Sequence, residues 1–216
     1  VIEGLKAAQP VDRLVLRVSR NVETSAAHYG LHDGDVLIGV PLDGPVHFLE
    51  NGLHFAADVV HGHKTGFFFD QRENRARARE RSVGRRVLDM FAYSGGFSVY
   101  AAAGGATSVT SVDVSAPALE AAAANIALNH EAAIRGFQHQ IVVEDAFAYL
   151  ERAHAAGQTF DMVIVDPPSF AKRAAEVDRA LAAYARLARL ALDVLEPGGV
   201  FVMASCSSRV TQDAFF

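Results

Sequence analysis

The sequence predicts an α/β fold with a mostly parallel sheet, preceded by a small β-rich module. From residue 86 onward, apolar runs alternate with Ala-rich helical segments. The apolar runs are continuous, which is typical of strands buried on both faces, so helices are expected on each side of the sheet. Hydrophobic residues make up 50% of the 216 positions, enough for a substantial core.

Five apolar runs are the expected strands and four Ala-rich segments are the expected helices. The strands are predicted at 86–91, 108–114, 139–146, 161–168 and 199–206. The helices are predicted at 95–105, 115–130, 146–157 and 175–199. Ser115 is the expected N-cap of the second helix, with Pro117 in its first turn, and EPGG at 196–199 is the expected stop of the last.

The stretch from 11 to 69 has a different pattern, with short strand-like runs separated by closely spaced turns. The turn signals include HDGD, PLDGP and ENG, as in a small β module. We place the boundary near Arg79, which gives a β-rich module with its linker at 1–78 and the α/β domain at 79–216.

Composition narrows the function classes. The net charge of −5 is not the basic footprint of a protein that binds nucleic acid unaided. Seven arginines between 72 and 86 form either a solvated helix face or a phosphate-facing patch, and composition leaves both open. A single cysteine excludes an internal disulfide. The sequence has neither a membrane-spanning run nor a signal pattern, so a cytoplasmic protein without membrane association is expected.

Acidic residues lie at the ends of successive predicted strands, where parallel sheets bind ligands. The first strand ends at Asp89, and Gly95 and Gly96 in the following loop allow close approach to a ligand. Their spacing is not GxGxxG, which counts against a dinucleotide fold. Asp113 could accept hydrogen bonds from both hydroxyls of a ribose, and Asp145 could accept one from an adenine amino group. Together they predict a site for an adenosine-containing cofactor.

The last two strands end in DPPSF (166–170) and ASCSS (204–208). Two prolines stiffen the first loop, whose acid and aromatic residue suit a flat heterocycle. Cys206 lies between Ser205 and Ser207, and neighbouring strands would bring it beside Asp166. The alternative is that Cys206 only fills the core.

In order and spacing, these motifs resemble the class I S-adenosylmethionine (SAM)-dependent methyltransferases, and within them the bacterial 23S ribosomal RNA cytosine-5 methyltransferases. The similar segments are 50–75, 87–115, 125–129, 160–172 and 204–208. The resemblance implies a Rossmann-like domain. Family members usually begin with a small RNA-binding domain of the PUA type and end their sheet with an antiparallel hairpin. Since the chain opens on Val1 and stops at Phe216, we expect it to lack both parts.

The resemblance also implies roles for individual residues. Asp113 would hold the ribose, Asp145 the adenine, and the loop 93–97 the methionine part of SAM, with FFFDQR (67–72) around the same cofactor. The full set of expected SAM-binding residues is Gln71, Arg72, Asp89, Phe91, Tyr93, Ser94, Gly95, Gly96, Phe97, Asp113, Val114, Ser115, Asp145, Ala146, Asp166 and Pro167. The expected substrate-binding residues are Pro168 and Phe170.

Cys206 and Asp166 are the expected catalytic residues. Cytosine C5 is a poor nucleophile, and addition of a thiolate to C6 would activate it. Asp166 would stabilise the adduct through N3 and the exocyclic amine of the base, and no residue is assigned to remove the C5 proton. Ribosomal RNA is the expected partner, and a homodimer is the oligomeric state to test.

Other functions stay open at this point. The nearest is SAM-dependent methylation of a nitrogen, either guanine N7 or an amino group. The related ribosomal RNA guanine-N7 methyltransferase has a motif similar to SNN at the tip of the last strand, where this chain has SCS. A non-catalytic RNA- or nucleotide-binding module is another, and an NAD oxidoreductase is disfavoured by the absent GxGxxG. His61 and His63 are expected to be loop residues, because two histidines without further Cys or acidic ligands nearby give poor support for a metal site.

Overall fold

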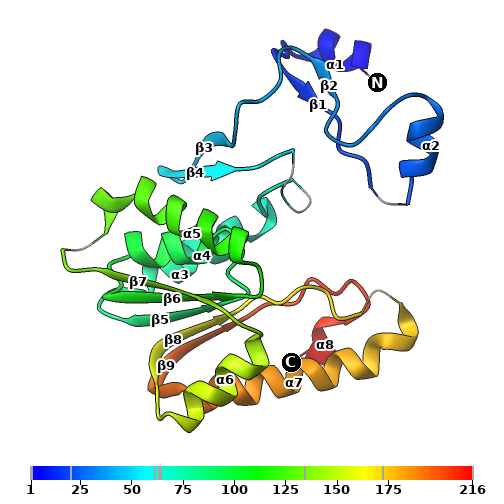
Figure 1. The fold of residues 1–216 in the computed structure, drawn as a ribbon. Coiled ribbons are helices and arrows are strands. Elements are labelled where there is room, and N and C mark those ends of the chain that lie inside the picture. Colours follow the sequence, from blue (N-terminus) through cyan, green and yellow to red (C-terminus); the bar gives the residue numbers. More distant parts are fainter. Residues whose placement is uncertain are drawn as a thin grey trace. The chain divides into compact units, whose positions relative to one another are not determined.

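The computed structural model describes residues 2–19, 21–60, 62, 65–133, 135–171 and 173–215 (Figure 1). The chain divides into two compact units. The first consists of Val1–Phe48 and Ala56–Phe68, and the second of Leu49–Phe55 and Phe69–Phe216. Among the described residues, no helix combines the length and apolar character needed to cross a membrane.

A five-stranded parallel sheet forms the centre of the second unit and confirms the predicted fold class. Its strands are β5 (Arg86–Met90), β6 (Ser108–Asp113), β7 (Gln138–Val143), β8 (Phe160–Val165) and β9 (Leu195–Met203). Their order in the sheet is β7-β6-β5-β8-β9. The chain therefore runs outward from β5 to β7 and then crosses back to β8. The strand order reverses between β5 and β8, and a ligand is expected outside the carboxyl ends at that point.

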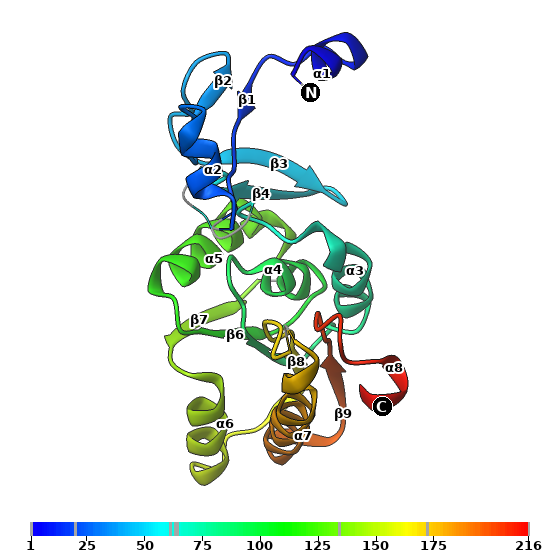
Figure 2. The ribbon, with the colours of Figure 1, turned by 90° about the vertical axis from the view of Figure 1, so that its right-hand side faces the viewer.

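Helices cover both faces of this sheet (Figure 1, Figure 2). One face carries α3 (Arg72–Glu80), α4 (Gly96–Ala103) and α5 (Ala116–Leu128), and the other α6 (Ala146–Ala155) and α7 (Val177–Asp193). Alternate residues of β5 enter the two cores, since Val87 packs with α4 while Leu88 and Met90 pack with α6 and α7. This two-sided burial explains why the strands are apolar without alternation.

Local sequence signals set most of the element boundaries. The Ser115 hydroxyl accepts a hydrogen bond from the Ala118 amide at 3.3 Å, which confirms the predicted N-cap of α5. The EPGG stretch lies inside β9 rather than in a loop, because α7 already ends at Asp193. Gly198 has a φ of +79°, and the β8–β9 register shifts next to Met162, so this start of β9 is irregular.

The first unit contains β1 (Leu14–Val15) and β2 (Val36–Ile38), which pair antiparallel, together with two short helices that the sequence analysis did not predict. These are α1 (Ile2–Ala8) and α2 (Glu23–His28). Glu23 in the first turn of α2 interacts favourably with the positive end of the helix dipole. The remaining short elements of the chain are the 3-10 turns η1 (Phe69–Gln71), η2 (His130–Ala132) and η3 (Ala174–Glu176) and the helix α8 (Gln212–Phe215).

A hairpin of β3 (Val46–Glu50) and β4 (Leu53–Ala57) turns at Asn51 and Gly52, whose φ angles of +50° and +79° suit a tight two-residue turn. The hairpin tip, Leu49–Phe55, belongs to the second unit. There the buried Glu50 carboxylate accepts hydrogen bonds from Nε and Nη2 of Arg75 at 2.7–2.9 Å.

The tip is also attached to the helices by backbone contacts. The Asn129 side chain accepts a hydrogen bond from the His54 amide and donates one to the His54 carbonyl. By these contacts α3 and the hairpin tip lie in the same unit as the sheet, whereas the boundary expected near Arg79 falls inside α3. The extent of the two functional domains stays a prediction.

Candidate functional site

The loop after β5 has an unusual backbone. Phe91 and Tyr93 have φ angles of +61° and +48°, a region that costs energy for residues other than glycine, and Gly95 has +77°. The end of β6 holds this conformation, because the Ala92 amide bonds to the Val112 carbonyl. The loop thus lies in a strained conformation at the carboxyl edge of the sheet, where a ligand is expected.

The same loop is clamped against α5. The Asn125 side-chain amide donates to the Ser94 carbonyl at 3.0 Å, and both residues are buried. A Cβ on Gly95 would lie 2.7 Å from the Cβ of Ala122, and a Cβ on Gly96 would lie 3.2 Å from Cδ of Arg75. Gly95 is therefore required both by its positive φ and by close packing on Ala122, whereas at Gly96 a Cβ would only crowd the Arg75 side chain.

Substituting Gly95 with alanine is expected to destabilise the protein by about 2–5 kcal/mol, because overpacking adds about 1–3 kcal/mol to the cost of about 1–2 kcal/mol for the positive φ. Gly84→Ala is the matched control, since Gly84 has a φ of +69° and open space where a Cβ would lie. Urea unfolding of both variants measures the difference. Equal losses of unfolding free energy in the two variants would show that the contact with Ala122 does not affect stability.

Asp113 lies at the junction of this loop and β6. Its Oδ2 accepts from the Tyr93 amide at 2.9 Å and its Oδ1 from the Ser115 amide at 3.0 Å. A carboxylate has about four acceptor positions, so two remain for the hydroxyls of a ribose. Val114 follows with 69% of its surface exposed and could cover one side of a base.

Asp145 is the N-cap of α6. Its Oδ1 accepts from the amides of Phe147 and Ala148 at 3.0 and 3.1 Å. Its Oδ2 makes no hydrogen bond to any residue that the structure describes. One carboxylate oxygen is thus structural, and the other could accept a bond from an amino group. Ala146 is buried in the core below, so only its backbone could contact a ligand.

Asp89 lies beneath the loop rather than on its surface, with 1% of its surface exposed. It accepts a hydrogen bond from the Ser98 hydroxyl at 2.6 Å, and Ser98 contacts Ser111 at 2.7 Å. Burial raises the pKa of Asp89 to about 7, helped by the charges of Asp166 and Asp113. Its assignment to the cofactor stays a prediction.

Because the Asp89 pKa is higher in the folded than in the unfolded protein, the native state binds the extra proton between about pH 4 and pH 7. The free energy of unfolding is therefore expected to fall as the pH rises through this window, by about 1.4 kcal/mol per pKa unit of difference. Asp89→Asn should flatten this decline, measured by urea unfolding from pH 5 to 8. Asp43→Asn, on the surface, is the control. A pH slope in Asp89→Asn equal to that of the wild type would contradict the raised pKa of Asp89.

Asp166 follows β8 and is connected to α3. It accepts a hydrogen bond from the Gln71 amide at 3.3 Å, and Gln71 in turn accepts one from Asn74 at 2.7 Å. Burial raises the pKa of Asp166 to about 6, with Asp70 adding to the effect and Arg75 opposing it. Both protonation states of this carboxyl are therefore accessible near neutral pH.

Cys206 is exposed just beyond the end of β9, so the alternative of a buried core cysteine is wrong. Its thiol lies 3.7 Å from the Pro167 carbonyl, directly after Asp166 in the chain. The pairing of β8 with β9 produces this proximity, as the sequence analysis expected. The structure thus brings both predicted catalytic residues to the same edge of the sheet.

Several other predicted site residues have different surroundings. Phe170 packs on Tyr184, with ring centroids 4.9 Å apart, and therefore points into a core cluster. Phe97 is a buried member of the core beside α4. Pro167 is buried, whereas Pro168, which follows the carbonyl that Cys206 contacts, is exposed. The roles of Pro168 and Phe170 in substrate binding stay predictions.

The arginines between 72 and 86 are mostly paired, which favours the solvated helix face over a phosphate-facing patch. Arg75 is buried with Glu50. The exposed pairs are Arg72 with Glu73, Arg81 with Glu80, and Arg86 with both Asp161 and Glu196. Arg72 is thus occupied on the surface by Glu73, and its expected contact with SAM stays a prediction. His61 and His63 lie outside the described residues.

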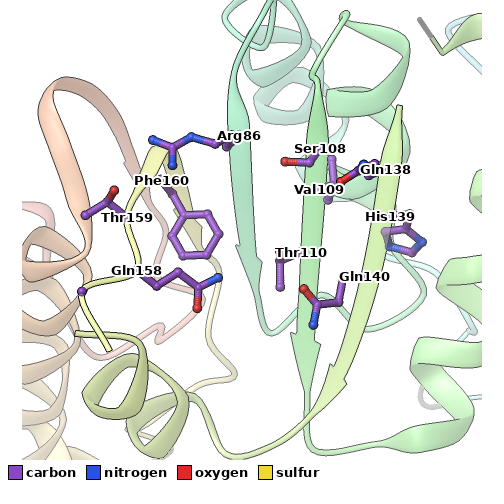
Figure 3. Close-up of a pocket in the computed structure, with 11 residues that line it drawn as sticks. Arg86, Ser108, Val109, Thr110, Gln138, His139, Gln140, Gln158, Thr159 and Phe160 are labelled. Carbon is purple, nitrogen blue, oxygen red and sulfur yellow. The ribbon is translucent and has the colours of Figure 1, made fainter. Parts of the chain in front are cut away.

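A separate hollow of about 540 Å³ lies at the other end of the strands. Its lining includes Arg86, Ser108 and Gln138, the first residues of β5, β6 and β7. Figure 3 shows Ser108 beside Gln138 and, further along the same two strands, Thr110 beside Gln140. Neutral polar side chains of this kind are typical of a solvated surface, and the hollow is distinct from the predicted site.

Sequence analysis did not identify the groups that support the site. Asn125 and Tyr184 are fully or almost fully buried and hold the two loops through polar atoms. Each is a polar residue in an otherwise Ala- and Leu-rich helix, at a position facing the core. A buried polar side chain needs a partner, and this was the available signal.

The hydrogen-bond acceptors at this edge fit an adenosine-containing cofactor. Asp113 retains two acceptor positions, Asp145 retains one oxygen, and the strained loop between them brings backbone close to the space outside the strand ends. The site has acceptors for a diol and an amino group, and no GxGxxG loop for a pyrophosphate. This combination supports SAM over a dinucleotide.

Comparisons with known proteins agree with this interpretation. A ribosomal RNA large subunit methyltransferase of Deinococcus radiodurans is 49% identical over 215 residues, covering 100% of this chain and 52% of that protein. The ribosomal RNA large subunit methyltransferase I of Shewanella frigidimarina is 41% identical over 171 residues, 79% of this chain and 42% of that protein. The crystal structure of SMU.776 complexed with SAH superposes with a TM-score of 0.72 at 32% identity, covering 83% of this chain and 46% of that one.

The chain spans about half the length of the two relatives. None of these three matches bears on the expected homodimer, which stays a prediction. Residues 17–215, nearly the whole chain, match the family described as S-adenosylmethionine-dependent methyltransferase. The fold, the hydrogen-bond acceptors at the carboxyl edge of the sheet and this match lead to one conclusion: the chain belongs to the S-adenosylmethionine-dependent methyltransferase family.

Proposed function

We propose that the chain is the catalytic part of an enzyme that methylates C5 of a cytosine in large-subunit ribosomal RNA, with Cys206 as the nucleophile. The observation that carries the proposal is the exposed Cys206 thiol, 3.7 Å from the Pro167 carbonyl and beside Asp166. The names of the Deinococcus and Shewanella relatives support ribosomal RNA as the substrate.

The thiol provides the activation that carbon methylation needs. As a thiolate, Cys206 adds to C6 of the base, and the electrons of the C5–C6 double bond move to make C5 nucleophilic. Bound SAM supplies an electrophilic methyl group. After C5 is methylated, its proton leaves, the C5–C6 double bond re-forms, and the Cys206 sulfur departs as a thiolate. Asp166, with a pKa raised to about 6, can donate a proton to N3 during the addition and take it back on elimination.

The cofactor assignments follow the geometry of the carboxyl edge. Asp113 would hold the ribose hydroxyls, and Oδ2 of Asp145 would accept from the adenine amino group. The strained loop from Tyr93 would meet the methionine part through its backbone, because Ser94 and Phe97 have buried side chains. Gln71 would contact the same region through its place beside Asp166.

Nitrogen methylation uses the lone pair of the acceptor and has no need for a thiol at this position. The two chemistries can be separated with large-subunit ribosomal RNA transcribed with tritium at C5 of cytosine. Methylation of C5 is expected to release one tritium into water for each methyl group transferred from SAM, and digestion should yield 5-methylcytidine. Methyl incorporation with full retention of tritium would overturn the proposal in favour of a nitrogen target.

A further inference from the structure

The two serines that flank Cys206 both form hydrogen bonds with the hydroxyl of one buried tyrosine. Ser205 donates to the Tyr184 hydroxyl at 3.0 Å, and the Tyr184 and Ser207 hydroxyls are 2.8 Å apart. Ser205 is half-buried and Ser207 is 4% exposed, while Cys206 between them is exposed. Both serine hydroxyls thus lie at Tyr184 while the Cys206 thiol between them faces the Pro167 carbonyl, and the Ser207 amide also donates to the Ser205 hydroxyl at 3.3 Å.

Ser207 also fastens the neighbouring loop. Its hydroxyl accepts from the amides of Phe170 and Ala171 at 3.1 and 3.4 Å and lies 3.1 Å from the Ser169 hydroxyl. The two amides use both lone pairs of this oxygen, so its proton is donated to Tyr184 or Ser169. One buried hydroxyl thus connects the end of β9, the loop after β8 and α7.

Tyr184, to which these hydroxyls bond, is itself held in place by packing. It is 3% exposed on α7, and its ring packs against Phe170 and Phe215 with centroids 4.9 and 5.3 Å away. A buried hydroxyl held by packing on several sides loses little further freedom when it forms hydrogen bonds.

We propose that Ser205, Ser207 and Tyr184 are positioning residues that hold the Cys206 thiol in place against the Asp166–Pro167 loop during addition to the base. None of the three touches the reacting atoms in this scheme. The inference rests on the proposed function, since it assigns these residues a purpose in the reaction of Cys206. It goes beyond that function by naming what fixes the geometry.

Two variants test this group of three hydroxyls, which we call the anchor of Cys206. Ser207→Ala removes the shared hydroxyl, and Tyr184→Phe removes only the phenolic oxygen while keeping the ring packing. Each is expected to slow formation of the Cys206 adduct with RNA containing 5-fluorocytosine by about 10- to 100-fold, because small displacements of a reacting group have effects of this size. Fluorine at C5 traps the adduct, since no proton can leave.

Two further measurements separate positioning from general damage. Cys206 is the only thiol in the chain, so its alkylation by iodoacetamide reports its intrinsic reactivity without background. That rate, and the affinity for SAM, should stay within about twofold of wild type, because an exposed thiol meets a diffusing reagent from many directions. The exposed Ser208→Ala, next in the chain, is the matched control and should change neither rate.

Amide hydrogen exchange tests the anchor without any reaction. In Ser207→Ala, the amides of Phe170 and Ala171 lose their acceptor and should exchange faster than in wild type. Unchanged exchange, or an adduct rate that falls only in parallel with alkylation and SAM affinity, would overturn the positioning role. If the wild type forms no adduct, the proposed function fails, and that result is distinct because exchange still decides whether the anchor exists.

Discussion

Cys206→Ala is expected to reduce methyl transfer to cytosine by about a thousandfold or more while leaving the affinity for SAM unchanged. In the proposed mechanism the effect is large because the thiolate creates the nucleophilic carbon, and alanine offers no electron pair for C6. Cys206 is not among the residues assigned to the cofactor, although its thiol lies 3.7 Å from the carbonyl of Pro167, which is. Single-turnover transfer from labelled SAM measures the loss, and isothermal titration measures cofactor affinity.

The wild type is expected to form a covalent complex with RNA containing 5-fluorocytosine, seen as a slower band on a denaturing gel, and the same substitution should remove it. Ser208→Ala, also exposed, controls for changes in the same loop. A wild-type rate of transfer by Cys206→Ala would show that carbon methylation through this thiol is not the reaction.

Arg75→Ala is expected to lower the free energy of unfolding by about 3–5 kcal/mol, because it leaves the Glu50 carboxylate buried without its partner. Tyr100 still donates to that carboxylate at 3.1 Å, but one neutral hydrogen bond does not compensate for the lost cation. Arg72→Ala on the same helix is the matched control. Its pair with Glu73 is 57% and 73% exposed, so a loss below about 1 kcal/mol is expected.

A double variant, Glu50→Leu with Arg75→Met, tests whether the cost comes from the unpaired charge. Replacing a buried ion pair by apolar residues of similar size is often neutral, so most of the stability should return. Urea unfolding of the four proteins decides the matter. Equal losses in Arg72→Ala and Arg75→Ala would contradict the assigned burial.

Sequence patterns predicted the central part of the fold and the edge of the sheet at which the candidate site is placed. Continuous apolar runs gave β5 to β9, and the Ser115–Pro117 signal gave the start of α5, because these features depend on short segments. The alternation of strands with helices further limited the topology, which placed Cys206 beside the loop after β8.

The remaining features depend on partners that are distant in the chain. The Arg-rich stretch looked uniform in sequence, yet Arg75 is buried because Glu50 comes from a hairpin 25 residues earlier. The sequence also gave no sign that the ring of Phe170, an expected substrate-binding residue, packs on Tyr184 from α7, and its role in substrate binding stays a prediction. Periodicity describes one segment at a time and carries no information about such encounters.

The hairpin tip also determines how the chain can be divided. The polypeptide enters the second unit at Leu49, leaves it after Phe55, and returns at Phe69, so the unit is discontinuous in sequence. A truncation that begins at Phe69 would keep every strand of the parallel sheet yet delete Glu50 and the His54 backbone that Asn129 binds. A stable excised domain must therefore retain the hairpin, either in its native connection or joined to the start of η1 by a linker.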